Sequence, residues 1–136
     1  MTWRYFVLIL VIILSDQITK SLVSYRNSFT KLNFGLSFGL FPKELAFFLS
    51  LSACIFLGVM AIFMARKSFI RHKRLALTLL LSGGISNVVD RFRFGGAVAD
   101  WIPFFGIFTF NIADAAISLG VILLLYDNLP TDSFRR

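Results

Sequence analysis

Four long apolar runs dominate this chain and limit what it can fold into. They cover residues 3–23, 45–65, 70–89 and 107–126. Each is close to the ~20 residues that a helix needs to cross about 30 Å of hydrocarbon. Only 15% of the 136 residues are charged, against about 25% in an average soluble domain. We therefore expect an all-α integral membrane protein with four transmembrane helices, in which residues 1–136 form a single membrane-embedded domain.

The positive charges of the chain predict its orientation in the membrane. Lysine and arginine exceed the acids by seven, an excess that in a soluble protein would suggest a nucleic-acid partner. Here the cations lie in short loops between apolar runs, where they set topology and contact anionic phospholipid, so we expect no nucleic acid. The densest cluster is the 66–74 loop. By the positive-inside rule, that loop and both termini are cytoplasmic.

Four aspartates fall at a common depth in this topology. At 1.5 Å per helical residue, Asp16 lies about 20 Å outward from Trp3, and Asp90 lies about 25 Å outward from Lys73. Asp100 belongs to the second outer loop, and Asp114 lies about 9 Å below the outer surface. A charged side chain in hydrocarbon costs about 2.5–3.5 kcal/mol even on lenient insertion scales. The shared depth therefore predicts one polar site at the outer leaflet.

The two outer loops carry different local signals. Between residues 32 and 40, apolar residues alternate with polar or small ones such as Asn33 and Gly35. This period of two is typical of a strand with one apolar face. We expect a small extracytoplasmic β element after the first helix, where Gly35 lets another backbone approach closely. In the second loop, Gly95 and Gly96 predict a turn, and Trp101 suits the membrane interface.

Several polar side chains inside the runs have a structural explanation. Asp16 and Lys20 are four residues apart, so they can form a salt bridge at the outer end of the first helix. Asn87, Asp90 and Arg91 follow a pair of glycines, and small residues allow helices to approach in membranes. We interpret these three polar residues as groups that hydrogen-bond between helices.

A process of elimination leaves a pair of carboxylates as the most plausible catalytic centre. The only histidine, His72, lies on the opposite side of the membrane, which excludes Ser–His and Cys–His pairs and leaves zinc without imidazole ligands. A Ser–Lys dyad with Lys20 stays possible, although no serine is marked out for it. Two carboxylates sharing one proton can act as base toward water and as acid toward the departing group. Asp100, just above the membrane, and Asp114, just inside it, are the best-placed pair.

Five sequence blocks resemble, in order, those of the signal peptidase II family of lipoprotein signal peptidases. They are DQITK (16–20), NFGLSFG (33–39), GGISNVVDR (83–91), VADWI (98–102) and FNIADAAISLG (110–120). Two departures from the family pattern are Ser86, where a glycine is usual, and VADWI in place of VVDF. The resemblance implies a bacterial aspartyl endopeptidase that removes signal peptides from diacylglyceryl-modified prolipoproteins, cutting before the lipidated cysteine.

The resemblance also implies roles for particular residues. Asp100 and Asp114 would be the catalytic dyad. We expect substrate-contacting or supporting roles for Asp16, Lys20, Asn33, Gly35, Asn87, Asp90, Arg91 and Asn111. We expect no metal and no cofactor. The expected partners are a lipid-modified prolipoprotein and membrane phospholipid, and the expected state is a monomer in the cytoplasmic (inner) membrane with its active site at the outer leaflet.

Two other functional classes compete with a peptidase. The same acids could form the relay of a small proton-coupled transporter. Against this, no ionisable residue lies in the inner half of any run to continue a proton path. The other alternative is an inactive relative that only binds lipoproteins, which the intact Asp100 and Asp114 argue against.

Overall fold

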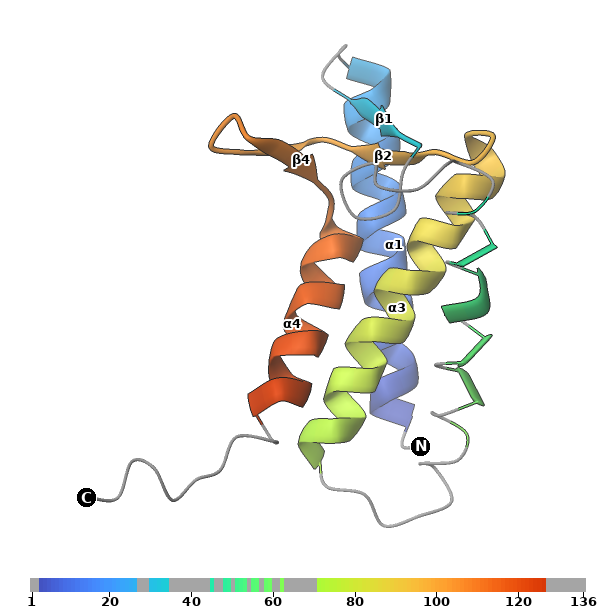
Figure 1. Ribbon diagram of the computed structural model, residues 1–136, viewed down its shortest axis with the longest axis vertical. Coiled ribbons are helices and arrows are strands. Elements are labelled where there is room, and N and C mark those ends of the chain that lie inside the picture. The colour runs from blue at the N-terminus through green and yellow to red at the C-terminus, as the bar shows by residue number, and fades with distance from the viewer. Residues whose placement is uncertain are drawn as a thin grey trace, which may run out of the picture.

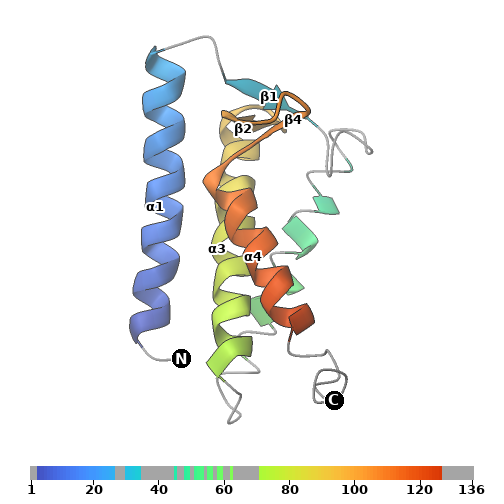
Figure 2. The same ribbon diagram turned by 90° about the vertical axis from the view of Figure 1, so that its left-hand side faces the viewer.

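Three helices run side by side and form the body of the protein (Figures 1 and 2). They are α1 (Trp3–Arg26), α3 (Arg71–Arg93) and α4 (Ile112–Tyr126). The structure is a computed structural model that describes residues 3–26, 30–34 and 71–126, together with individual positions between 45 and 62. Those individual positions are helical as well, in agreement with the second apolar run as far as it is described. The rest of that run and the 66–70 part of the basic loop lie outside the described residues.

The helices have the length and surface of a membrane protein. Within the described ranges, Trp3–Ser24 and Lys73–Arg93 are long and apolar enough to cross a membrane, and Ile112–Tyr126 is a shorter apolar helix. Large apolar side chains of α1, such as Leu14 and Leu22, are more than half exposed. In water this exposure would be unfavourable, whereas lipid tails solvate such a surface well.

The helix boundaries differ from the sequence prediction at the outer ends. The helices α1 and α3 continue beyond the predicted ends at residues 23 and 89, to Arg26 and Arg93. The prediction of a helix from residue 107 is wrong, because α4 begins only at Ile112. Its start is fixed by a capping box. The side chain of Asn111 accepts from the Asp114 amide at 2.8 Å, and the carboxylate of Asp114 accepts from the Asn111 amide at 3.2 Å.

Two small antiparallel sheets lie across one end of the helices, where α1 and α3 end and α4 begins (Figure 1). Strand β1 (Lys31–Asn33) pairs with β2 (Val98–Asp100) so that Lys31 is opposite Asp100. Strand β3 (Ile102–Phe104) pairs with β4 (Phe108–Phe110) as a hairpin. Between α3 and β2 the chain turns at two glycines with φ of 59° and 101°, which confirms the predicted turn.

The sheets confirm one part of the predicted β structure and correct another. A strand does follow the first helix, but it pairs with a segment of the second outer loop, about 65 residues later in the chain. For that second loop only a turn and an interfacial tryptophan are predicted, whereas the structure has three strands there. Each is only three residues long, too short for an alternating pattern to appear. Residues 35–44, including Gly35, lie outside the described residues.

Small residues allow α3 and α4 to approach closely. A Cβ atom on Gly83 would overlap the carbonyl oxygen of Ala113 and lie 2.7 Å from the side chain of Ile117. A Cβ atom on Gly120 would lie 2.8 Å from the carbonyl oxygen of Ala76. Since Ala113 directly precedes Asp114, the glycine contact also sets the distance of that carboxylate from α3.

We expect Gly83→Ala to push α4 away from α3, which lowers both stability and activity. Overpacking of this kind typically costs about 1–3 kcal/mol, and the backbone oxygen of Ala113 cannot rotate away. Thermal unfolding in detergent and turnover per folded molecule would measure the two effects. Gly58→Ala is the matched control, because a Cβ atom there meets nothing within 4 Å. Equal stability of the two variants would contradict the close contact.

Candidate active site

Asp100 and Asp114 lie at the end of the helices that carries the sheets, where β2 ends and α4 begins. Asp100 is the last residue of β2 and is 2% exposed. Its Oδ1 atom accepts a hydrogen bond from Asn111 Nδ2 at 2.8 Å, and its Oδ2 atom accepts one from Asn33 Nδ2 at 3.2 Å. Two neutral amides therefore fix the orientation of this carboxylate.

Asp114 is held by a similar pair of donors. Its Oδ1 atom accepts from Asn87 Nδ2 at 2.8 Å, and its Oδ2 atom accepts from the Asn111 backbone amide. The side chain of Asn111 also lies 3.3 Å from Asn87 Oδ1. Asn111, which is fully buried, thus contacts Asp100 through its side chain and Asp114 through its backbone. It joins the two carboxylates into one site.

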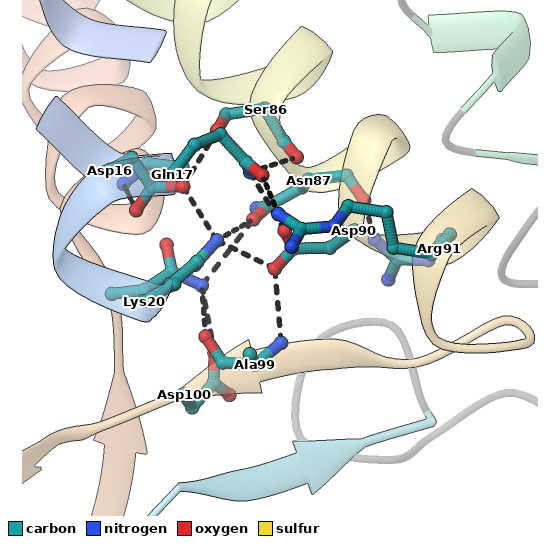
Figure 3. Close-up of polar contacts among 12 residues, drawn as sticks. Asp16, Gln17, Lys20, Ser86, Asn87, Asp90, Arg91, Ala99 and Asp100 are labelled. Atoms are coloured by element: carbon teal, nitrogen blue, oxygen red, sulfur yellow. Dashed lines mark hydrogen bonds and ion pairs between the residues drawn. The ribbon is translucent and has the colours of Figure 1, made fainter. Parts of the chain in front are cut away.

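A buried group of charges from α1 and α3 belongs to the same polar cluster as Asp100 (Figure 3). The Lys20 Nζ atom is 2.6 Å from Asp16 Oδ2 and 2.7 Å from Asp90 Oδ2, and all three side chains are at most 1% exposed. Lys20 Nζ also lies 3.5 Å from Asn87 Oδ1. The predicted pairing of Asp16 with Lys20 is confirmed. It is a buried contact between helices rather than an isolated bridge at a helix end, because Asp90 belongs to α3.

The arrangement brings together the predicted site residues that the structure describes. Arg91 is buried, and its Nη1 atom donates to the Asn87 carbonyl at 3.3 Å on its own helix. Asn87 and Asp90 make the contacts between elements that the sequence analysis expected of them. The polar cluster at this end of the helices contains Asp16, Lys20, Asn33, Asn87, Asp90, Arg91, Asp100, Asn111 and Asp114.

Comparison with known proteins identifies the family. The family model described as Signal peptidase (SPase) II matches residues 8–129. This chain belongs to the signal peptidase II family. Relatives named lipoprotein signal peptidase include one from Chlamydia pneumoniae, 40% identical over 99 residues that cover 69% of this chain and 58% of that protein. Another, from Fusobacterium nucleatum, is 30% identical and covers 92% of this chain and 86% of that protein.

Solved structures support the same fold for this signal peptidase II family member. A bacterial membrane enzyme matches with a TM-score of 0.80 at 21% identity, covering 98% of this chain and 92% of that one. The fold is therefore that of a mostly helical membrane enzyme with small β-sheets. The chain spans 58% of the Chlamydia pneumoniae relative and 61% of one from Methylobacterium radiotolerans.

The sequence analysis missed two residues in the polar cluster of this signal peptidase II family member. Gln17 Nε2 donates to Asp90 Oδ1 at 2.7 Å and to Ser86 Oγ at 3.0 Å. Ser86 Oγ donates to Asp16 Oδ2 at 2.6 Å. Two signals could have found them. Gln17 directly follows Asp16, and Ser86 is a departure from the family pattern about one helical turn before Asp90.

The electrostatic surroundings of Asp100 favour its protonated form. Burial, followed by the negative charge of Asp114, raises the pKa of the Asp100 carboxyl to about 6. The hydrogen bonds from Asn33 and Asn111 and the charge of Lys20 act in the opposite direction. A carboxyl of this pKa can hold a proton near neutral pH and release it again, as an acid–base catalyst must.

We expect Asn33→Ala to raise the pKa of Asp100 further. The Asn33 amide stabilises the ionised carboxylate, so its loss favours the protonated form. A hydrogen bond to a charged group contributes about 1.5–3 kcal/mol, which corresponds to a shift of roughly one pH unit or more. The pH dependence of turnover would measure the shift. Leu32→Ala, a change at an exposed neighbour on the same strand, should leave the profile in place, and an unmoved profile in Asn33→Ala would contradict the contact.

Proposed function

We propose that this protein is a lipoprotein signal peptidase. In this proposal it is an intramembrane aspartyl endopeptidase that removes the signal peptide from diacylglyceryl-modified prolipoproteins and cleaves before the lipidated cysteine. The observation that carries the proposal is the joining of Asp100 and Asp114 by Asn111 at the outer end of the helices. Membership of the signal peptidase II family favours this reaction over a proton-coupled transporter that uses the same acids.

The proposed mechanism uses one proton shared by the two carboxylates. The ionised member takes a proton from a water molecule as that water attacks the scissile carbonyl carbon. The protonated member then supplies the proton that the departing amine requires. Asn111 and Asn33 hold Asp100 in place, and Asn87 holds Asp114. With both carboxylates fixed by neutral donors, no side chain must reorient during the reaction.

The proposed location follows from the substrate. A diacylglyceryl group keeps its acyl chains in the bilayer, so the bond beside it is presented at the membrane surface. In our proposal residues 1–136 form one monomeric domain with four spans in the bacterial inner membrane, with both termini in the cytoplasm. The polar cluster then lies at the outer leaflet, surrounded by phospholipid.

The test of this function is cleavage of a defined substrate. The purified protein would be incubated with a synthetic prolipoprotein peptide that carries diacylglyceryl on its cysteine, and the product masses would be measured. We expect one cut, directly before the lipidated cysteine, and none in the same peptide without lipid. Failure to cut in lipid and in detergent, by protein shown to be folded, would reject the proposal.

We expect a cysteine at position 31 to be accessible from the outside, and one at position 68 to be inaccessible. Lys31 is exposed on β1 beside the proposed site, whereas Ser68 lies in the basic loop that should stay in the cytoplasm. Both substitutions would be made with Cys54 replaced by alanine, and intact cells would be treated with a membrane-impermeant thiol reagent. Labelling at position 68 but not 31 would reverse the proposed orientation.

A further inference from the structure

We infer that Gln17 and Ser86 are positioning residues, which set the separation of the Asp100 and Asp114 carboxylates without contacting either of them. This inference deepens the proposed function and rests on it for the catalytic roles of the two aspartates. Four sets of contacts among the described residues carry it.

Each proposed catalytic aspartate is preceded by a residue whose backbone amide donates to another buried carboxylate. Asp16 Oδ1 accepts from the amide of Ala113 at 3.0 Å, and Ala113 precedes Asp114. Asp90 Oδ2 accepts from the amide of Ala99 at 3.1 Å, and Ala99 precedes Asp100. The distance between the Asp16 and Asp90 carboxylates therefore helps to set the distance between β2 and the start of α4.

Two connections link the Asp16 and Asp90 carboxylates. Lys20 Nζ lies between them, as described above. The second connection is a chain of hydrogen bonds in which Ser86 Oγ donates to Asp16 at 2.6 Å and Gln17 Nε2 donates to Asp90 at 2.7 Å. The chain is closed by the hydrogen bond from Gln17 Nε2 to Ser86 Oγ (Figure 3).

The hydrogen-bond chain through Gln17 and Ser86 fixes the orientation of the Asp16 and Asp90 carboxylates, which the ion pairs with Lys20 do not. An ammonium group is a compact point charge whose donors rotate, so Lys20 attracts both carboxylates without fixing their planes. An amide is planar, and the orientation of Gln17 is itself fixed, because its Oε1 atom accepts from Arg93 Nη1 at 2.8 Å. That contact leaves the Gln17 amino group facing Asp90. Ser86 is fully buried, with its hydroxyl held between two partners.

Gln17 and Ser86 are uncharged, so their effect on the position of the catalytic carboxylates can be measured separately from any change in charge. The charged groups around the two catalytic carboxylates are Asp16 and Lys20 from α1, Lys31 from β1, and Asp90 and Arg91 from α3. Removing an amide or a hydroxyl changes none of these charges. A change in the titration of Asp100 in such a variant therefore reports a changed geometry.

The test compares Gln17→Met and Ser86→Ala with the wild-type protein. The methionine keeps the length of the side chain, and both changes remove the hydrogen-bond chain. The titration of Asp100 would be followed by infrared difference spectroscopy of its carboxyl band, assigned with Asp100→Asn. If the carboxylates move apart by about 1 Å, their weaker repulsion lowers the Asp100 pKa by roughly half a pH unit. We also expect kcat to fall about tenfold with KM changed less than twofold, since misplacement of about 1 Å is costly to catalysis.

Thr19→Val is the matched control, because the Thr19 hydroxyl bonds only backbone carbonyls of its own helix among the contacts described. It should leave both the titration and kcat unchanged. An unmoved Asp100 titration in both test variants would overturn the inference, as would a loss of folded protein with no change in titration. Because the infrared measurement needs no turnover, a moved titration in a protein that fails to cleave would support the positioning role and reject only the proposed function.

Discussion

Asp100→Asn and Asp114→Asn should each reduce prolipoprotein cleavage to background while the protein stays folded. Asparagine preserves the size of the side chain but cannot take up and release a proton, so the water is no longer activated. The double variant should be hardly worse than either single one, because catalytic groups that act as a unit are non-additive. Product formation from a lipidated precursor peptide, together with binding of that peptide, would measure the effect. Substantial cleavage by either folded variant would exclude the dyad, and Lys20→Met would then test a Ser–Lys alternative.

Asp100→Asn and Asp114→Asn should differ in how much they lower the stability of the folded protein. At position 100, the new amide can turn its NH₂ group toward Asn33, whose own amide can rotate to accept. At position 114, one partner is the backbone amide of Asn111, which can only donate. The amide oxygen must then stay on that partner, and the NH₂ group faces the Asn87 amino group. The Asn87 amide cannot rotate to accept without losing the contacts of its oxygen with Lys20 and Asn111. We therefore expect Asp114→Asn to be the less stable of the two.

The raised pKa of Asp100 adds a dependence of stability on pH. Its folded-state pKa of about 6 lies above the ordinary value of 3.8, so the folded protein binds the proton more tightly than the unfolded chain. Between these two pH values the contribution of Asp100 to stability falls as pH rises. Above about pH 6 the carboxyl is ionised in both states, and the full cost of burying its charge lowers the stability of the folded protein. Asp100→Asn removes this ionisation. Above pH 6, it should unfold at a temperature equal to or above that of the wild-type protein.

Lys20→Met should produce the largest loss of stability among single substitutions in the polar cluster. It leaves the buried carboxylates of Asp16 and Asp90 without their shared cation, and breaking a buried ion pair in this way typically costs about 3–5 kcal/mol. Thermal unfolding in detergent would measure the loss. Lys31→Met is the matched control, because Lys31 is exposed, and exposed charges usually contribute less than about 1 kcal/mol.

A companion variant distinguishes charge from packing in this cluster. Asp90→Asn should itself be destabilised at least as clearly as it is slowed in turnover. Added to Lys20→Met, it removes one of the two uncompensated negative charges, so the double variant should lose less than the sum of the two single losses. Additive losses would mean that the attraction between Lys20 and Asp90 contributes little. Full stability with abolished turnover in Asp90→Asn would instead place Asp90 in the catalytic group.

The sequence was sufficient to predict that the polar side chains gather at one end of the helices, and it identified most members of this cluster. Helical rise converts sequence position directly into depth, so Asp16, Asp90 and Asp114 could be placed at one level. Spacing on a helix also predicted the pairing of Asp16 with Lys20. These inferences succeed because they depend on local geometry that an apolar helix fixes almost regardless of its neighbours.

What the sequence did not predict depends on contacts between distant segments. The pairing of β1 with β2 joins residues 65 to 69 apart, and the hydrogen bond from Asn33 to Asp100 joins residues 67 apart. The contact of Gln17 with Ser86 joins residues 69 apart, and no pattern within either helix reports it. The late start of α4 is a different case, because the Asn111–Asp114 capping box is local. Continuous hydrophobicity from residue 107 masked that signal.

The contacts around Ala113 have a consequence for the order of events during synthesis. Asp16 is made early, yet one of its partners is an amide at the start of α4, 97 residues later. Asn111, which joins the two proposed catalytic carboxylates, is made at the same late stage. A growing chain that has not yet inserted α4 therefore carries a buried lysine and two acids but no complete catalytic centre. In our proposal the site becomes competent only when α4 docks, because α4 carries Asp114 and begins directly after Asn111. A partly synthesised molecule without α4 should therefore be unable to cleave prolipoproteins.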